Sequence, residues 1–341
     1  MTQTSTETPM PHNRLEHFPV AFFSAVMGLM GTSLAVEAAG FNTVGHGIAA
    51  FAAAVFATQA VLYIIKAVRY PTAVAAEWNH PIKLAFFPAI SISLLLAAIA
   101  LRGSMSDLAA IIWGIGAVGQ AVLTLAIVTS WISHRGFGVG QMSPAWFIPA
   151  VGNVIAPIAG VPLGFVEASW YFFAIGLLFW IVLLTLVFNR LVFHDPLPGK
   201  LRPTLTILIA PPAVAFLAWL QLNGGVLDPL ARVLYNLALF FTALVLLQAR
   251  GLLRLPFALS FWALSFPIAA MTIASFRFGA LSGASVFTAI GWTLLLLLTV
   301  IIAGLVWRTG WAVRRDEMCQ PEQRSAASDV RRSAEYEIDR R

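Results

Sequence analysis

Ten apolar runs constrain the fold of this chain more than any other feature of its sequence. A hydrocarbon core about 30 Å thick needs roughly 20 apolar residues per spanning helix, and each run is close to that length. Because 59% of the 341 residues are hydrophobic and only 11% are charged, the composition fits an integral membrane protein. We predict an all-α polytopic membrane protein with ten transmembrane helices at 18–38, 44–66, 82–101, 108–132, 145–161, 168–193, 204–222, 229–249, 256–276 and 286–307.

The basic residues are distributed unevenly between the two sides that these spans define. If the N-terminus is cytoplasmic, all but three of the 21 Lys and Arg residues lie on the cytoplasmic side, and the outer loops hold Arg102, Arg232 and Arg277. The positive-inside rule therefore predicts cytoplasmic N- and C-termini. We separately expect the membrane to be a bacterial inner (plasma) membrane. We attribute the net charge of +6 to basic residues that set this topology and not to residues that bind nucleic acid. We therefore expect a lipid bilayer as partner and no nucleic acid. The predicted domains are a cytoplasmic segment, a transmembrane channel domain and a charged cytoplasmic tail, at 1–17, 18–307 and 308–341.

Proline placement repeats with a period of about one helical hairpin. The odd-numbered spans each open with a proline: Pro19, Pro81, Pro144, Pro203 and Pro256. Further prolines lie deeper in the odd spans and not in the interiors of the even spans: Pro88, Pro149, Pro157, Pro211, Pro212 and Pro267. An interior proline frees a carbonyl, which in a membrane must be buried in protein or face water. We therefore predict five helical hairpins in a quasi-five-fold arrangement, with kinked odd helices lining a central pore and even helices facing lipid. The alternative is that membrane helices simply tolerate proline.

Ionisable residues avoid the middle of the predicted spans. All 15 Asp and Glu residues lie in the termini, in loops or at helix ends, whereas coupled carriers generally keep an ionisable residue in the membrane. This distribution favours a passive pathway over a coupled pump. The single cysteine, Cys319, excludes cysteine-based metal and iron–sulfur sites. We expect no cofactor, no metal and no enzymatic activity, because the sequence presents no nucleophile–base pair and no metal-ligand set.

Basic residues also gather at the cytoplasmic starts of the odd helices. The predicted anion-attracting mouth consists of Lys83, Arg135, Lys200, Arg202 and Arg254. Each odd helix adds an N-terminal dipole end equivalent to about half a positive charge, so the ring as a whole would attract anions. The alternative is that these residues only fix the topology.

One sequence string at each odd span carries a family resemblance. The strings are HFPVAFFSAVMG (17–28), HPIKLAFFP (80–88), SPAWFIPAVGN (143–153), KLRPTLTILIAPPAVA (200–215) and FWALSFP (261–267). They resemble the tellurite-resistance and dicarboxylate transporter family, which includes the plant slow-type guard-cell anion channels. Over residues 17–307 the resemblance implies ten helices, of which five inner ones line a pore, and a homotrimer with one pore per subunit. It also implies a phenylalanine plug on the ninth helix, a role that falls on Phe266.

The predicted site is therefore a pore gate, Phe266, surrounded by pore-lining or kinked positions. These positions are Pro267, Ala263, Leu259, Ala270, Phe87, Pro88, Pro149 and Pro211. The leading hypothesis is a channel that conducts small inorganic or organic anions passively and is occluded by the Phe266 ring. The alternative is a secondary transporter or exporter of tellurite, sulfite or dicarboxylates, coupled to protons. A membrane binding or assembly module without a pathway is the third hypothesis.

Overall fold

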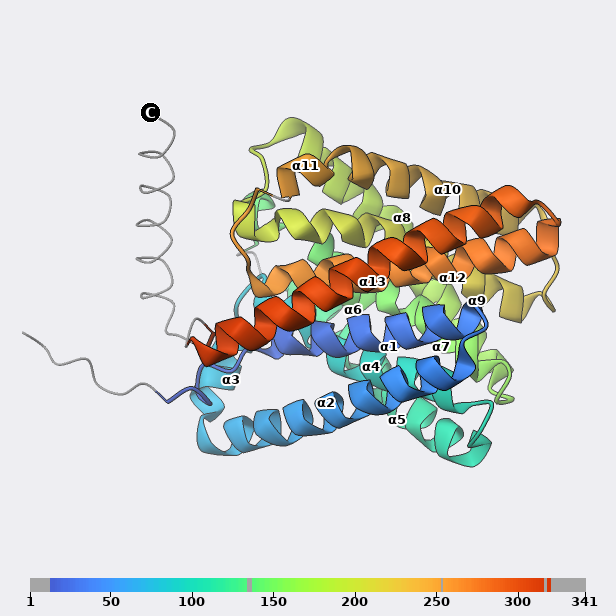
Figure 1. Cartoon of the computed structure of the whole chain (residues 1–341). Helices are drawn as coiled ribbons and strands as arrows, with labels where there is room; N and C mark the ends of the chain where they lie inside the picture. Colours follow the sequence, from blue (N-terminus) through green and yellow to red (C-terminus); the bar gives the residue numbers. More distant parts are fainter. Residues whose placement is uncertain (1–12, 134–136, 253, 316–317, 320–341) are drawn as a thin grey trace, which may run out of the picture.

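The structure is a computed structural model that describes residues 13–133, 137–252, 254–315 and 318–319, and every regular element in these ranges is helical (Figure 1). The first half of the chain forms η1 (Val20–Phe22), α1 (Phe23–Ala38), α2 (Asn42–Arg69), α3 (Pro71–Trp78), η2 (Lys83–Phe86), α4 (Ala89–Leu101), α5 (Ser106–Ser133), η3 (Val139–Gln141), η4 (Pro144–Trp146), α6 (Phe147–Val151), η5 (Gly152–Ile155) and α7 (Ala156–Gly160). The second half forms α8 (Val166–Phe193), η6 (Gly199–Ile209), α9 (Ala210–Leu222), α10 (Pro229–Leu247), α11 (Ala249–Leu252), η7 (Leu259–Leu264), α12 (Ser265–Ser282) and α13 (Ser285–Arg314). The η elements are 3-10 helices.

Nine of these helical stretches, within the described residues, are long and apolar enough to cross a membrane. The prediction of an all-α fold rich in spanning helices is confirmed. The predicted span at 145–161 differs, because Pro144–Gly160 is a chain of short pieces, η4, α6, η5 and α7. Pro149 and Pro157 lie near the starts of α6 and α7, where proline is tolerated but a continuous helix is not.

A buried polar network stabilises this broken span. The Pro149 carbonyl accepts hydrogen bonds from Thr124 Oγ1 at 2.8 Å, Gln120 Nε2 at 3.1 Å and Asn153 Nδ2 at 3.4 Å. Asn153 Nδ2 also donates to Thr124 Oγ1 at 3.0 Å, and Ser91 Oγ donates to Gln120 Oε1 at 2.7 Å. A carbonyl released by an irregular backbone is costly in an apolar medium unless it is paired. Side chains of the neighbouring helix α5 supply two of these donors.

The odd-numbered spans share a change of helix type along their length. Each begins as a 3-10 helix and continues as an α-helix, which gives five inner segments: η1–α1, η2–α4, η4–α6–η5–α7, η6–α9 and η7–α12. The prolines predicted as interior kinks lie at these transitions. Pro88 is the N-cap of α4, Pro211 the second residue of α9 and Pro267 the third residue of α12. Because the first N–H groups of an α-helix have no intrahelical acceptor, proline there removes no α-helical hydrogen bond. The spans therefore change helix type at these prolines instead of kinking within a long α-helix.

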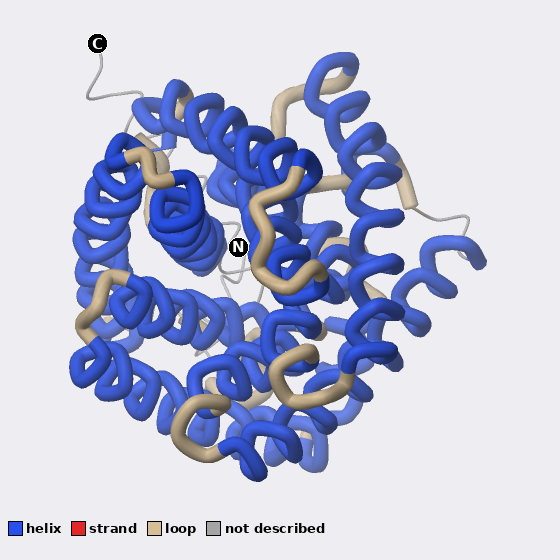
Figure 2. The backbone as a smooth tube through the Cα atoms, turned by 90° about the vertical axis from the view of Figure 1, so that its right-hand side faces the viewer, coloured by secondary structure: helices blue, strands red, loops and turns tan. Residues whose placement is uncertain are grey.

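Figure 2 views the helix bundle roughly end-on. In this bundle the inner segments contact one another in a closed circuit. In their α-helical parts, α1 contacts α4 and α12, α7 contacts α4 and α9, and α9 contacts α12. The 3-10 helices repeat this circuit in the order η1, η2, η4, η6, η7 and back to η1. Each inner segment also packs against the long helix that follows it, in the pairs α1–α2, α4–α5, α7–α8, α9–α10 and α12–α13.

The long outer helices α2, α5, α8, α10 and α13 expose apolar side chains. Between 17% and 39% of their apolar windows is buried, against between 56% and 83% for those inner segments that qualify as spans. Exposed large side chains occur on all five outer helices: Val61, Ile111, Leu178, Phe240 and Leu296. Such faces suit a hydrocarbon solvent, in which helix backbones are internally satisfied.

A buried ion pair fixes the first inner segment to the first outer helix. Lys66 Nζ lies 3.0 Å from Glu77 Oε2 and donates to the Phe18 carbonyl at 2.8 Å. Glu77 also accepts from Tyr63 Oη at 2.8 Å and from the Val20 N–H at 3.3 Å. Glu77 lies between the predicted spans 44–66 and 82–101, and the short helix α3 buries it. This network lies at the end of the bundle where η1 and the last turns of α13 meet η7, which we call the terminal end (Figure 1). The other end, where α1 turns into α2, is the loop end.

Candidate functional site

Two cavities lie between the inner segments, and they share part of their walls. The smaller cavity has a volume of about 60 Å³, and the larger has a volume of about 540 Å³. Ile155, Val214 and Phe266 line both cavities. These three side chains therefore lie at the boundary between the two spaces.

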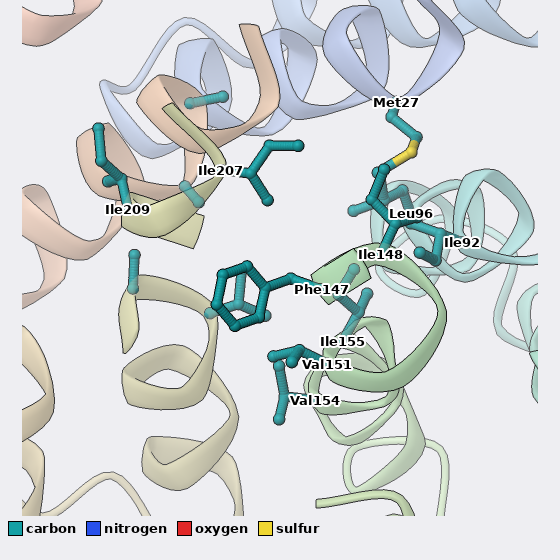
Figure 3. Close-up of a cluster of buried hydrophobic side chains, with 14 of the residues drawn as sticks. Met27, Ile92, Leu96, Phe147, Ile148, Val151, Val154, Ile155, Ile207 and Ile209 are labelled. Atoms are coloured by element: carbon teal, nitrogen blue, oxygen red, sulfur yellow. The ribbon is translucent and has the colours of Figure 1, made fainter. Parts of the chain in front are cut away.

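The smaller cavity is apolar and draws on all five inner segments. Its lining includes Met27 of α1, Ile92 of α4, Phe147 of α6, Ile207 of η6 and Trp262 of η7. Figure 3 shows Met27, Phe147 and Ile207 approaching a common space from three different elements. A narrow space lined in this way offers an ion almost no compensation for its lost hydration.

Phe266 reaches the boundary because α12 packs closely against α1. A Cβ added to Gly31 of α1 would lie 3.1 Å from Cδ2 of Phe266 and 3.1 Å from Cβ of Ala269. A Cβ on Gly28 would lie 2.0 Å from Oγ of Ser265, the residue before Phe266. Small residues permit such close approach of membrane helices. Because Gly28 and Gly31 have no side chains, α12 lies close to α1, and this packing positions the Phe266 ring.

The larger cavity is polar at the loop end. Glu37, His46, Arg102 and Arg277 line it, together with apolar residues of α4, α9 and α12. An Nη1 N–H of Arg102 donates to the carbonyl of Ile158. Burial and the nearby Arg277 guanidinium lower the pKa of Arg102, and the Glu37 carboxylate opposes them. Among the described residues, neither arginine has a carboxylate within 4.0 Å.

The predicted site residues divide between the two cavities and the surrounding protein. Ala263, Pro211 and Pro267 line the smaller cavity with Phe266, and Ala270 lines the larger one. Leu259, Phe87, Pro88 and Pro149 are absent from both linings.

In the second inner segment, η2–α4, Phe86 lines the smaller cavity in place of Phe87. The Phe87 ring packs edge-on against Trp78 at 5.0 Å and Tyr63 at 6.3 Å, between the inner segment and helices α2 and α3. Pro88 instead caps α4, and its carbonyl accepts from Ser91 Oγ at 2.9 Å. The 3-10 geometry of η2 turns successive side chains by a different angle from an α-helix, which helical spacing alone does not anticipate.

The predicted basic mouth lies around the 3-10 circuit. Lys83 begins η2, Lys200 and Arg202 lie in the first turn of η6, and Arg254 precedes η7. None of these four lines either cavity. Arg135 lies outside the described residues.

The polar residues of the larger cavity were not recognised from the sequence as one site. Arg102 follows α4 and Arg277 lies in α12, two inner segments that are far apart in the chain. Only the fold brings the two arginines to one cavity. The sequence did contain one signal. Only three basic residues lie in the predicted outer loops, and Arg102 and Arg277 are two of them. Glu37 near the end of α1 and His46 near the start of α2 line this cavity too. The described residues hold no group of three His, Cys, Asp or Glu side chains placed to bind a metal.

Comparison with known proteins gives relatives from plants, archaea and bacteria. The chain is 29% identical to the S-type anion channel SLAH3 of Arabidopsis thaliana over 237 residues, which cover 69% of this chain and 37% of that protein. It is 24% identical to the uncharacterized transporter MJ0762 of Methanocaldococcus jannaschii, over 74% of this chain and 82% of that protein. It is 26% identical to the tellurite resistance protein TehA homolog of Haemophilus influenzae, over 79% of this chain and 84% of that protein.

The chain spans less than half the length of the plant relatives SLAH3 and SLAH2. The sequence model of one family nevertheless matches most of this chain, from residue 17 to residue 310. That match includes all five inner segments and the residues of both cavities. The chain therefore belongs to the voltage-dependent anion channel family.

Proposed function

We propose that this protein is an anion channel whose pathway runs between the five inner segments and is closed by the ring of Phe266. The observation that carries the proposal is that Phe266 lines both cavities. A phenyl ring in a narrow apolar passage blocks ions by steric exclusion and by dewetting. The closed circuit of inner segments supports a quasi-five-fold arrangement of five hairpins around that passage.

Charges at both ends of the bundle favour anions over cations in this proposal. Arg102 and Arg277 lie in the larger cavity, and Lys83, Lys200, Arg202 and Arg254 surround the starts of the inner segments. The starts of the inner segments add their own partial positive charge, and such fields raise the local concentration of anions.

The test is the anion current of Phe266→Ala beside the wild type, in oocytes or planar bilayers with chloride on both sides. Phe261→Ala is the matched control, because Phe261 lies in the same inner segment, stacks on Phe257 at 5.9 Å and lines neither cavity. We expect Phe266→Ala to raise the current about tenfold or more, which corresponds to a barrier lower by about 1.4 kcal/mol. Phe261→Ala should conduct like the wild type. Equal currents from Phe266→Ala and wild type would refute the gate.

A second candidate is a proton-coupled exporter of tellurite, sulfite or dicarboxylates. Glu37 and His46 favour it, because both are titratable and both line the larger cavity. Intramembrane or pathway-lining carboxyl and imidazole groups commonly relay protons in transporters. Anion flux that follows a pH gradient at fixed voltage, and is lost in Glu37→Gln, would favour this candidate. Flux that follows only the anion gradient and the voltage would favour the channel.

We further propose a homotrimer with one pathway per subunit, in a bacterial inner membrane with both termini in the cytoplasm. The family resemblance supports the trimer, and the exposed apolar faces of the outer helices provide surface for both lipid and neighbouring subunits. The uneven distribution of basic residues supports the orientation. Light scattering of the detergent-solubilised protein should give the mass of three chains, and a monomer mass would contradict the trimer.

A further inference from the structure

The larger cavity contains more positive charge than its own carboxylate compensates. Arg102, Arg277, Glu37 and His46 are the ionisable groups among the described residues that line it. Two guanidinium groups and the His46 imidazole therefore line this cavity with a single carboxylate. The two arginines also come from different inner segments, since Arg102 follows α4 and Arg277 lies in α12.

Glu37 does not neutralise either arginine by direct contact. Its carboxylate lies beyond 4.0 Å from both guanidinium groups. Its Oε1 atom is buried and has no hydrogen-bond partner among the described residues. The side chain packs against the backbone of α2, where a Cβ on Gly45 would lie 2.3 Å from Cγ of Glu37. A partly buried charge such as that of Arg102, without a carboxylate in direct contact, favours a bound counter-ion.

The chemistry of the two guanidinium groups, those of Arg102 and Arg277, indicates which counter-ion fits. Arg102 uses one Nη1 N–H on the Ile158 carbonyl, which fixes its side chain and leaves further N–H groups for a ligand. Arg277 is exposed within the open part of the cavity. A guanidinium presents paired N–H groups that match two oxygens of one anion. A halide can accept from such a fork but does not match its spacing.

We propose that Arg102 and Arg277 form a binding site for a small monovalent oxoanion of carboxylate geometry in the larger cavity. The site deepens the proposed function, on which it rests, because it names the class of anion that would occupy the pathway on the loop-end side of Phe266. One bound monovalent anion brings the two arginines and Glu37 to neutrality. Glu37 then acts as a fixed repulsive charge that weakens binding.

The test measures formate binding by the full chain purified in detergent, from the broadening of the formate proton resonance at constant ionic strength. Arg277→Gln is the main variant, because Arg277 is exposed and its loss leaves no buried group unpaired. Arg277→Lys keeps the charge and removes the fork. Arg232→Gln is the matched control, since Arg232 is an exposed arginine at the start of α10 that lines neither cavity.

We expect Arg277→Gln to raise the formate Kd about tenfold, as expected for the loss of a charge-assisted hydrogen bond. Arg277→Lys should weaken formate binding less than Arg277→Gln, Glu37→Gln should strengthen it, and Arg232→Gln should leave it unchanged. A Kd for Arg277→Gln that equals the wild-type value, or a Kd raised equally by Arg232→Gln, would overturn the site. Displacement of formate by chloride as effectively as by acetate would overturn its assignment to oxoanions.

This measurement requires no conduction, so the two proposals can fail separately. Unchanged current in Phe266→Ala with intact formate binding would refute the gate and retain the site. Increased current in Phe266→Ala with no effect of Arg277→Gln on binding would refute the site and retain the gate.

Discussion

At the scale of single residues, contacts between α1 and α12 decide where the Phe266 ring lies. The sequence string FWALSFP predicted a phenylalanine before a proline in an inner helix. It contained no information about the partner surface, which is the backbone of α1 at Gly28 and Gly31. A glycine in a sequence does not show which element packs against it, so its effect on a neighbouring side chain is known only from the structure. The position of Phe266 along its own helix was therefore predictable, and its position between two cavities was not.

Gly28→Ala should separate α1 from α12 and destabilise the protein. The new Cβ would lie 2.0 Å from Oγ and 2.7 Å from Cβ of Ser265, and overpacking of this kind costs about 1–3 kcal/mol. Thermal unfolding in detergent should show a lower Tm for Gly28→Ala, and Ser265→Gly in the same chain should restore it. Gly47→Ala is the control, because a Cβ there meets nothing within 4 Å. Equal Tm values for Gly28→Ala and Gly47→Ala would contradict the close packing.

A second residue-scale prediction concerns Asp228, which lies between two spans and caps α10. The N–H of Ala231 donates to its carboxylate at 2.8 Å and lowers the pKa of Asp228, and the Trp219 indole N–H at 2.9 Å acts in the same direction. A lowered folded-state pKa means that this contribution to stability is present above the ordinary carboxyl pKa and is lost as pH falls through the folded-state value. The wild-type Tm should therefore exceed that of Asp228→Asn near neutral pH, and the difference should shrink as pH falls below about 4. A difference that does not change with pH would contradict the assignment.

At the scale of elements, the odd spans show which structural features the proline pattern could predict and which it could not. Sorted prolines indicated that the odd spans differ from the even ones, and in the structure each odd span begins as a 3-10 helix. They did not reveal the switch from 3-10 to α-helix, because proline is compatible with the first turn of an α-helix as well as with a kink. The sequence pattern also did not predict the polar residues that stabilise the broken span. Gln120 and Thr124 lie on an outer helix, and their role depends on the Pro149 carbonyl across the interface.

Thr124→Val should weaken the contact between α5 and the broken span. The substitution keeps the shape of the side chain and removes the hydroxyl that donates to Pro149 O at 2.8 Å and accepts from Asn153 Nδ2 at 3.0 Å. A hydrogen bond of this kind contributes about 0.5–1.5 kcal/mol net, so the loss of these bonds should lower the Tm of the detergent-solubilised protein. Thr58→Val provides the control, because the exposed Thr58 hydroxyl donates only to the Ala54 carbonyl one turn earlier. A drop of the same size in both variants would show that the network adds no stability.

At the scale of the whole molecule, the alternation of buried and exposed helices follows from composition and proline placement. The all-α class was predicted on that basis and is confirmed, and those inner segments that qualify as spans are more buried than the outer helices. The larger cavity could not be predicted, because its ionisable residues come from positions 37 to 277 and meet only in the folded chain. Neither could the division of the interior into two cavities, which depends on three side chains from different segments.

The central claim is that the two cavities are parts of one anion pathway divided by Phe266. Cysteine accessibility tests it directly, with Cys319 replaced by serine and a cysteine placed at Ala263 in the smaller cavity or at Ala270 in the larger one. A slim anionic thiol reagent such as dicyanoargentate is added from the loop end of oriented protein in membranes. We expect rapid modification of Ala270→Cys in both backgrounds. Modification of Ala263→Cys should be at least about tenfold faster with Phe266→Ala than with Phe266, as for a barrier lower by about 1.4 kcal/mol. Equal rates at Ala263→Cys in the two backgrounds would contradict the central claim.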